Sequence, residues 1–167
     1  MSKNELQEIF DNKVGLPYKD KILKLEETLI NIADGVNIIG DGKTVVYSDI
    51  CPVKHSFVDG VYIREMKMDK GLLIVGCIHK YSHVWFLLDG KIAIATENGM
   101  KEYEGPVYVI TEPGIKRAGF VIEDCTFINI HPNPSNTQDL KELESNLIAF
   151  SYEEYEKHLK NKLWKKY

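Results

Sequence analysis

The middle of the chain, residues 36–131, alternates short apolar runs with turns that contain glycine. The runs recur about every ten residues, which is the spacing of an all-β sandwich or barrel. They cover residues 61–68, 72–78, 84–88, 92–96, 107–111, 119–122 and 126–130. Asp89-Gly90 and Asn98-Gly99 are typical of tight hairpins, because such turns need residues that tolerate a positive φ. The sequence therefore predicts an antiparallel β-barrel over residues 36–131.

Helical patterns flank this region at both ends. Residues 4–13 and 18–34 carry apolar side chains three or four positions apart. In the second segment these side chains are Ile22, Leu25, Leu29 and Ile32. Such a stripe is stable only when it packs on something. Residues 1–35 are therefore an N-terminal helical arm, which docks either on its own barrel or on a neighbouring subunit.

The C-terminal part, residues 132–167, is expected to be a second helical extension. Thr137 precedes a helical pattern at 138–146, and Ser151 precedes another at 152–164. Serine and threonine favour the position before a helix because their hydroxyl groups accept a hydrogen bond from a free backbone N–H group. The sequence thus predicts one barrel between two helical extensions.

Composition excludes several classes of protein. The chain has 167 residues, about one domain's worth, and a net charge of −4, which disfavours nucleic-acid binding through phosphate neutralisation. No apolar run reaches the roughly 20 residues of a membrane span, and the first five residues are polar, unlike a signal peptide. The three cysteines, Cys51, Cys77 and Cys125, are widely spaced and form no CxxC pair. We therefore expect a protein that is neither secreted nor bound to a membrane.

Two motifs carry the most specific information. Residues 71–90 contain His79 and His83, and residues 105–117 contain a Pro113-Gly114 turn followed by Arg117. Together they resemble the two motifs of the cupin superfamily, small antiparallel jelly rolls. Counting back from Gly90, the motif's glutamate position falls on His83, its second histidine on His79 and its first histidine on Cys77, while the histidine of the second motif falls on Arg117. The resemblance implies an all-β core with a cupin-type double-stranded β-helix and helical extensions at both ends.

Residues 53–147 resemble, more narrowly, a group of small cupins encoded by bacteriophages and prophages, which has no agreed biochemical role. The resemblance rests on residues 55–65, 78–80, 113–119, 123–124 and 130–131. It implies a setting in the host cytoplasm or the virion, with other phage structural proteins as partners.

A cupin metal site surrounds one divalent ion with three imidazoles and a carboxylate and leaves open positions. Arg117 cannot ligate a metal, because its guanidinium group stays protonated. His79 and His83 remain as ligands, and His131 becomes a third if its strand faces inward. Three histidines could hold a divalent transition metal such as zinc, iron or nickel. In the alternative, the histidines are hydrogen-bonded residues at the barrel mouth and no cofactor is present.

Cationic residues form the second candidate site. In the cupin register His79, Lys80, Lys116 and Arg117 come together, and Arg64 can join them. The chain has only two arginines, Arg64 and Arg117, and the planar guanidinium group suits a carboxylate or phosphate ligand. In the alternative, the arginines pair with Glu65 and Asp124 and lock strands together. The ligand-binding candidates are Tyr62, Arg64, His79, Lys80, His83, Lys116, Arg117 and His131.

Three functions remain open at this point. The first is a non-catalytic, oligomeric structural or interaction component of a phage or virion. The second is a small-molecule-binding cupin that takes an anionic ligand at the barrel mouth. The third, a metal-dependent cupin enzyme, is disfavoured because the metal tetrad is incomplete. We expect a homo-oligomer, because exposed strand edges and sheet faces otherwise promote unwanted association.

Overall fold

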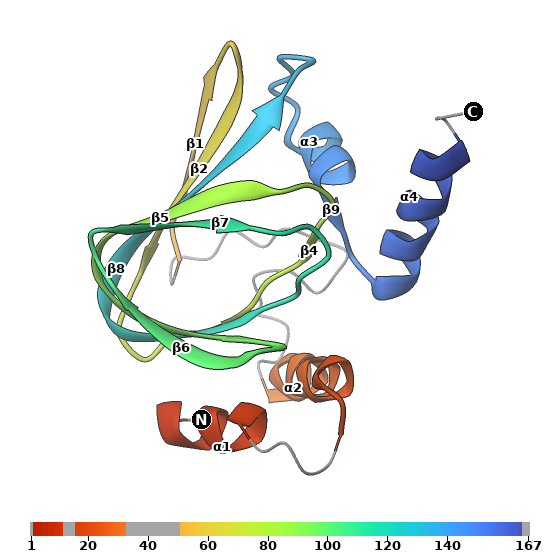
Figure 1. The fold of residues 1–167 in the computed structure, drawn as a ribbon. Helices are drawn as coiled ribbons and strands as arrows, with labels where there is room; N and C mark the ends of the chain where they lie inside the picture. The colour runs from red at the N-terminus through yellow and green to blue at the C-terminus, as the bar shows by residue number, and fades with distance from the viewer. Residues whose placement is uncertain (1, 12–15, 33–50, 165–167) are drawn as a thin grey trace.

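The structure, a computed structural model, describes residues 2–11, 16–32 and 51–164. An antiparallel β-barrel forms its centre, and helices lie at both ends of the chain (Figure 1). The predicted all-β core of cupin type, with N-terminal and C-terminal helical extensions, is confirmed. No helix in the described ranges is long and apolar enough to cross a lipid bilayer.

The helices are α1 (Lys3–Asp11), α2 (Tyr18–Ile32), α3 (Leu140–Leu147) and α4 (Tyr152–Trp164). The strands are β1 (Val53–Val58), β2 (Gly60–Met68), β3 (Leu73–Val75), β4 (Ile78–His79), β5 (His83–Thr96), β6 (Gly99–Glu104), β7 (Val107–Thr111), β8 (Ala118–Asn133) and β9 (Ile148–Ala149).

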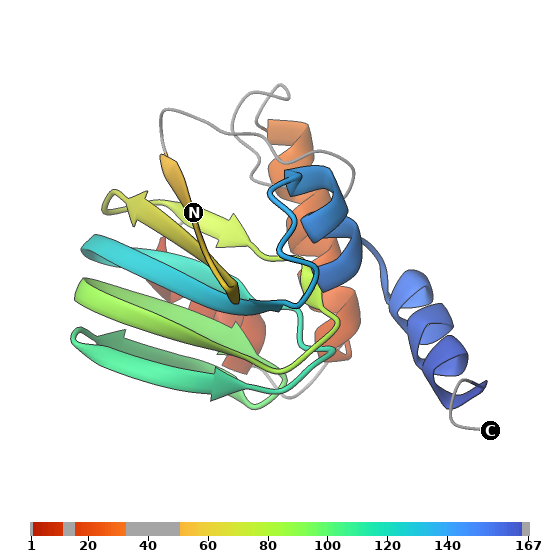
Figure 2. The ribbon, with the colours of Figure 1, turned by 90° about the horizontal axis from the view of Figure 1, so that it is seen from above.

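Two long strands, β5 and β8, connect the two halves of the barrel. They pair with each other on both sides of a bend. The first part of β5 and the last part of β8 form one half together with β7, β2 and β1. The remaining parts form the other half together with β6 and β3. The halves therefore face each other across a common interior, which is the jelly-roll arrangement (Figure 1). Figure 2 looks onto the first half, where β8 lies between β2 and β5.

The hairpin predicted at Asp89-Gly90 is wrong. β5 continues through these residues as one strand, and its register against β8 shifts there. Gly90 has a φ of 71°, and a Cβ atom on it would lie 2.0 Å from the backbone oxygen of Asp124. The glycine thus permits a bend where two strands approach closely, rather than a turn between strands. Residues 119–122 and 126–130, predicted as separate strands, likewise belong to the single strand β8. The hairpin predicted at Asn98-Gly99 does join β5 to β6.

The main hydrophobic core lies between the two halves. Trp85 and Leu87 alternate with outward-facing residues on β5 and are almost completely buried. The Trp85 ring stacks on Phe127 and contacts Tyr103 edge-on. The core is completed by Cys51, Met66, Met68, Ile92, Ile94, Val121 and Cys125.

The N-terminal helices pack on the outside of their own barrel. Leu6 and Phe10 of α1, with Ile22 and Leu25 of α2, are buried in one cluster that also contains Val75, Ala95 and Ala118 of the barrel. Leu29 of the predicted stripe is partly buried against the same cluster, and the side chain of Ile32 lies outside the described residues. Of the two docking modes left open by the sequence, the structure shows the arm on its own domain. The predicted arm end at 33–35 and barrel start at 36–50 also lie outside the described residues.

In the C-terminal extension, α3 lies at one end of the barrel, and α4 projects away from it (Figure 1). The predicted cap of the first helix is wrong by two residues: the carboxylate of Asp139 accepts hydrogen bonds from the backbone N–H groups of Lys141 and Glu142. Thr137 instead donates to the Glu142 side chain. The second helix begins as predicted, because the Ser151 hydroxyl accepts from the backbone N–H of Glu154. Between the helices, β9 pairs with β4 and so ties the extension to the strand that carries His79.

Candidate metal and ligand site

Strand pairing places two histidines side by side on the inner face of the barrel. Val84 of β5 pairs with Ile130 of β8, so His83 and His131, one residue toward the barrel mouth, are neighbours. On its other side, His131 pairs with Tyr62 of β2, and their rings stack with centroids 6.0 Å apart. Because side chains alternate along a strand, His131 faces inward together with Asn129 and Phe127.

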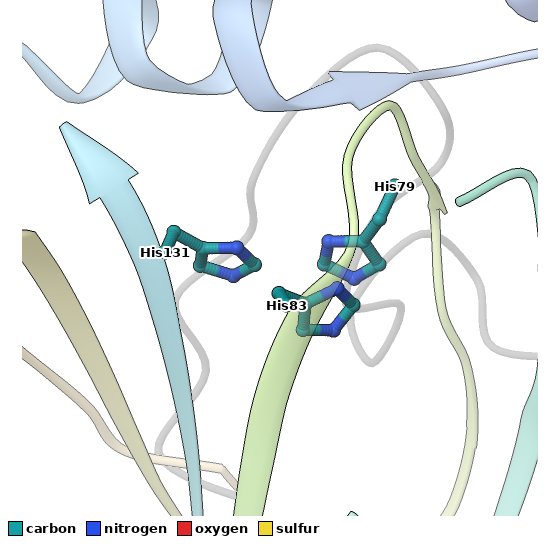
Figure 3. Close-up of side chains that lie close together, drawn as sticks. All are labelled: His79, His83 and His131. Atoms are coloured by element: carbon teal, nitrogen blue, oxygen red, sulfur yellow. The ribbon is translucent and has the colours of Figure 1, made fainter. Parts of the chain in front are cut away.

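His79 reaches the same point from β4. Its backbone oxygen accepts a hydrogen bond of 2.9 Å from the N–H of Gly114, and its strand is held by β9. The ring centroid of His79 lies 3.9 Å from that of His83 and 5.0 Å from that of His131. Figure 3 shows the three imidazoles turned toward one another from three separate segments. One potential ligand atom from each ring lies within 4.8 Å of the others.

The environment keeps these imidazoles neutral at neutral pH. Burial holds the pKa of His79 well below its usual range. Charge repulsion from His83, His131, Arg117 and Arg64, which disfavours a proton on His79, lowers the pKa further. Burial lowers the pKa of His83 to about 4 and the pKa of His131 to about 3. A neutral imidazole offers a lone pair, which is the form that ligates metals.

The donor set fits a divalent transition metal. Nitrogen ligands on a tetrahedral zinc ion lie at about 2.1 Å from it, and therefore about 3.4 Å from each other. The observed spacing, within 4.8 Å, is wider than that value. Nδ1 of His79 and Nε2 of His83 are buried and have no hydrogen-bond partner in the described part of the chain. Buried polar atoms are normally satisfied, so these nitrogens lack the partner that a metal ion would supply.

A cavity of about 190 Å³ lies beside the histidines. Arg64 on β2 and Arg117, directly before β8, reach it from the two opposed halves of the barrel. Neither arginine forms an ion pair with a carboxylate of the described ranges, so the strand-locking pairs with Glu65 and Asp124 are not observed. Most of the remaining wall is apolar, with Ile92, Ile94, Phe127, Leu143 and Leu147 among its residues.

The structure brings some of the sequence candidates to this cavity and takes others elsewhere. Tyr62, Arg64, His79, Arg117 and His131 line it, and His83 lies against His79 and His131. Lys80 and Lys116 lie elsewhere.

Lys80 and Lys116 are engaged by carboxylates of the helical extensions. The Lys80 ammonium lies 3.2 Å from a carboxylate oxygen of Glu154 on α4 and donates to the backbone oxygen of Ser145. The ammonium of Lys116 is buried and lies 2.7 Å from a carboxylate oxygen of Glu26 on α2. Neither lysine is among the residues that line the cavity. In this structure both lysines fasten helices to the barrel.

Cys77 lines the cavity but does not join the histidines. Among the residues that the structure describes, no cysteine, aspartate or glutamate belongs to the three-histidine group. Burial raises the pKa of the Cys77 thiol, so the sulfur stays protonated at neutral pH. The cysteine at the first histidine position of the cupin motif is therefore not a ligand of this cluster.

Three further polar residues that line the cavity were not predicted from the sequence: His55, Asn129 and Glu144. His55 of β1 pairs in register with Arg64, and its Nδ1 lies 2.6 Å from the Tyr62 hydroxyl oxygen. Asn129 could have been found, because it lies two residues before His131 and so shares its face of the strand. Glu144 lies on α3, and no local pattern links that helix to the barrel interior.

Comparison with known proteins supports no assignment beyond the fold. No protein-family model matches the sequence, and no protein of curated function is similar to it. Solved structures of cupins do match. They include the Schizosaccharomyces pombe Cnp3 cupin domain (15% identity, 62% of this chain and 76% of that chain, TM-score 0.46). KdgF from Halomonas sp. has 10% identity over 51% of this chain and 80% of that chain, with a TM-score of 0.45. A cupin-2 domain protein from Shewanella frigidimarina has 12% identity over 48% of this chain and 80% of that chain, with a TM-score of 0.41. The assignment of this chain as a cupin-type jelly roll rests on the strand order and register described above.

Proposed function

We propose that this chain is a metal-binding cupin-type protein that holds one divalent transition metal through His79, His83 and His131. The observation that carries the proposal is the convergence of three neutral imidazoles, two of them with an unpartnered buried nitrogen. A metal held by three imidazoles keeps open coordination positions, at which it supplies Lewis-acid chemistry to a bound oxygen ligand. His79 and His131 line the same cavity as Arg64 and Arg117.

Metal analysis tests this proposal directly. We expect full-length protein, stripped of metal with a chelator that is then removed, to bind close to one equivalent of Zn²⁺, Co²⁺ or Ni²⁺ in titration calorimetry. His83→Ala should weaken that binding by more than about a hundredfold, because loss of a ligand costs more than loss of the residues behind it. His158→Ala is the matched control, since His158 lies on α4 against Tyr81 and Tyr155, away from the cluster. Wild-type protein that binds none of the three metals, or a His83 variant that binds as well as the wild type, would show the proposal to be wrong.

The setting in a phage or virion stays a prediction from the sequence. The homo-oligomer also stays a prediction, and an apolar surface on the outside of the barrel is an argument for it. Pairing across β7, β5, β8 and β2 puts Ile110, Val84, Ile130 and Ile63 in one row on the outer face. Tyr108 and Ile110 are 62% and 68% exposed there. A continuous apolar face is typical of an interface, and a second copy presents the same face for a twofold contact.

Sedimentation or light scattering checks the oligomer. We expect a dimer at micromolar concentration, and we expect the double variant Tyr108→Glu, Ile110→Glu to run as a monomer, because the charges would have to be buried at the contact. Leu159→Glu is the control, since Leu159 is also exposed but lies on α4. A monomeric wild-type protein would contradict the prediction.

A further inference from the structure

We infer that the cavity beside the three histidines binds a small aliphatic carboxylate, held by the guanidinium groups of Arg64 and Arg117. The inference names the ligand class of the proposed metal site and rests on that proposal for one point only, the position of the metal at the ligand's polar end. The arginines themselves belong to the protein without metal, so their contribution is measurable separately.

The first argument is charge. Two guanidinium groups line one small cavity, and Glu144 is the carboxylate among its described lining residues. The Arg64 guanidinium lies 2.8 Å from the Met66 sulfur, and Arg117 donates a hydrogen bond to the Thr111 hydroxyl. Neither of these partners carries a negative charge. Burial lowers the pKa of Arg117, which is the sign of a cation removed from water. A buried cation that is not paired is costly unless an anion compensates it.

The second argument is geometry. Arg64 lies on β2, in register with His55 and Asn129, and Arg117 lies before the part of β8 that belongs to the opposite half of the barrel. The two guanidinium groups therefore approach from opposed walls. His79 and His131 line the same cavity as both arginines. An anion that both arginines contact would lie next to the three imidazoles.

The third argument is size and polarity. A cavity of about 190 Å³ is smaller than the usual site for a drug-sized ligand. A cavity of this size therefore suits a small ligand. Apolar side chains such as Ile92, Phe127 and Leu143 suit a short hydrocarbon chain, and the flat fork of an arginine suits a carboxylate. A phosphate, which is polar on all sides, fits this apolar wall poorly.

Butyrate and its uncharged isostere butyramide test the inference on metal-free, full-length protein after chelator treatment. Ligand-observed NMR should show butyrate binding at least tenfold tighter than butyramide. Arg64→Gln and Arg117→Gln should each weaken butyrate binding at least tenfold, whereas Lys67→Gln, on the same strand as Arg64 but exposed, should not change it. The comparison of the two ligands on the wild type decides the question even if one arginine variant fails to fold.

Three outcomes would overturn the inference: equal binding of butyrate and butyramide, butyrate binding that survives both arginine substitutions, or binding of inorganic phosphate in preference to butyrate. The result is separable from the metal proposal. In His83→Ala, metal-free butyrate binding should persist within threefold of the wild type, and in Arg64→Gln the Zn²⁺ stoichiometry should stay at one. If wild-type protein binds butyrate but no metal, only the metal proposal fails. If it binds metal but no butyrate, only the carboxylate inference fails.

Discussion

Replacing Leu87 with alanine should lower the free energy of unfolding by about 2–5 kcal/mol. Leu87 is 0% exposed and packs in the core between the two halves of the barrel. Its truncation removes apolar contacts and leaves a space that the rigid strands on either side cannot fill. The midpoint of urea unfolding, followed by tryptophan fluorescence, measures the loss.

The adjacent Leu88 provides the control. It has the same side chain on the same strand but is 48% exposed on the outer face. Leu88→Ala should therefore change the free energy of unfolding by no more than about 1 kcal/mol. Equal effects of the two substitutions would mean that the alternation of inner and outer faces along β5 is wrong.

Replacing Gly90 with alanine should destabilise the protein by about 2–5 kcal/mol. A left-handed backbone conformation costs a non-glycine residue about 1–2 kcal/mol, and forced overpacking adds about 1–3 kcal/mol. Gly90 meets both conditions, since its φ is 71° and the new Cβ would lie 2.0 Å from the Asp124 oxygen and 2.7 Å from the Cys125 Cβ. The obstacle is backbone of β8, which cannot move aside without breaking the pairing.

Gly71→Ala separates the two contributions. Gly71 has a φ of 89°, and nothing lies within 4 Å of a Cβ placed on it. Gly71→Ala should therefore lower the free energy of unfolding only by the conformational contribution, about 1–2 kcal/mol. Thermal unfolding of both variants beside the wild type checks the difference. A Gly90 variant as stable as the Gly71 variant would show that β5 and β8 do not approach closely at the bend.

Much of the fold could be predicted from local patterns. The spacing of apolar runs indicated an antiparallel barrel, because alternation of side chains marks a strand with one buried face. The cap at Ser151 was also predictable, because capping depends on residues within one helical turn. Asp89-Gly90 was not, since the same glycine that permits a hairpin also permits a bend where another strand passes. Only the presence of β8 alongside distinguishes the two.

The candidate site, too, could be predicted only in part. Motif counting selected His79 and His83, and the count of arginines drew attention to Arg64 and Arg117. Whether His131 faced them depended on the pairing of β8 with β5 and β2, which joins residues about fifty and about seventy positions apart.

The sequence by itself determined the type of fold, the candidate histidines and the scarcity of arginine. The tertiary structure alone decided that Lys80 and Lys116 meet carboxylates of α4 and α2, which leaves two arginines as the cations of the cavity. The physical reason is that alternation along a strand determines which face of the sheet a side chain occupies. Which residue it contacts there depends on the register and packing of segments that are distant in the chain.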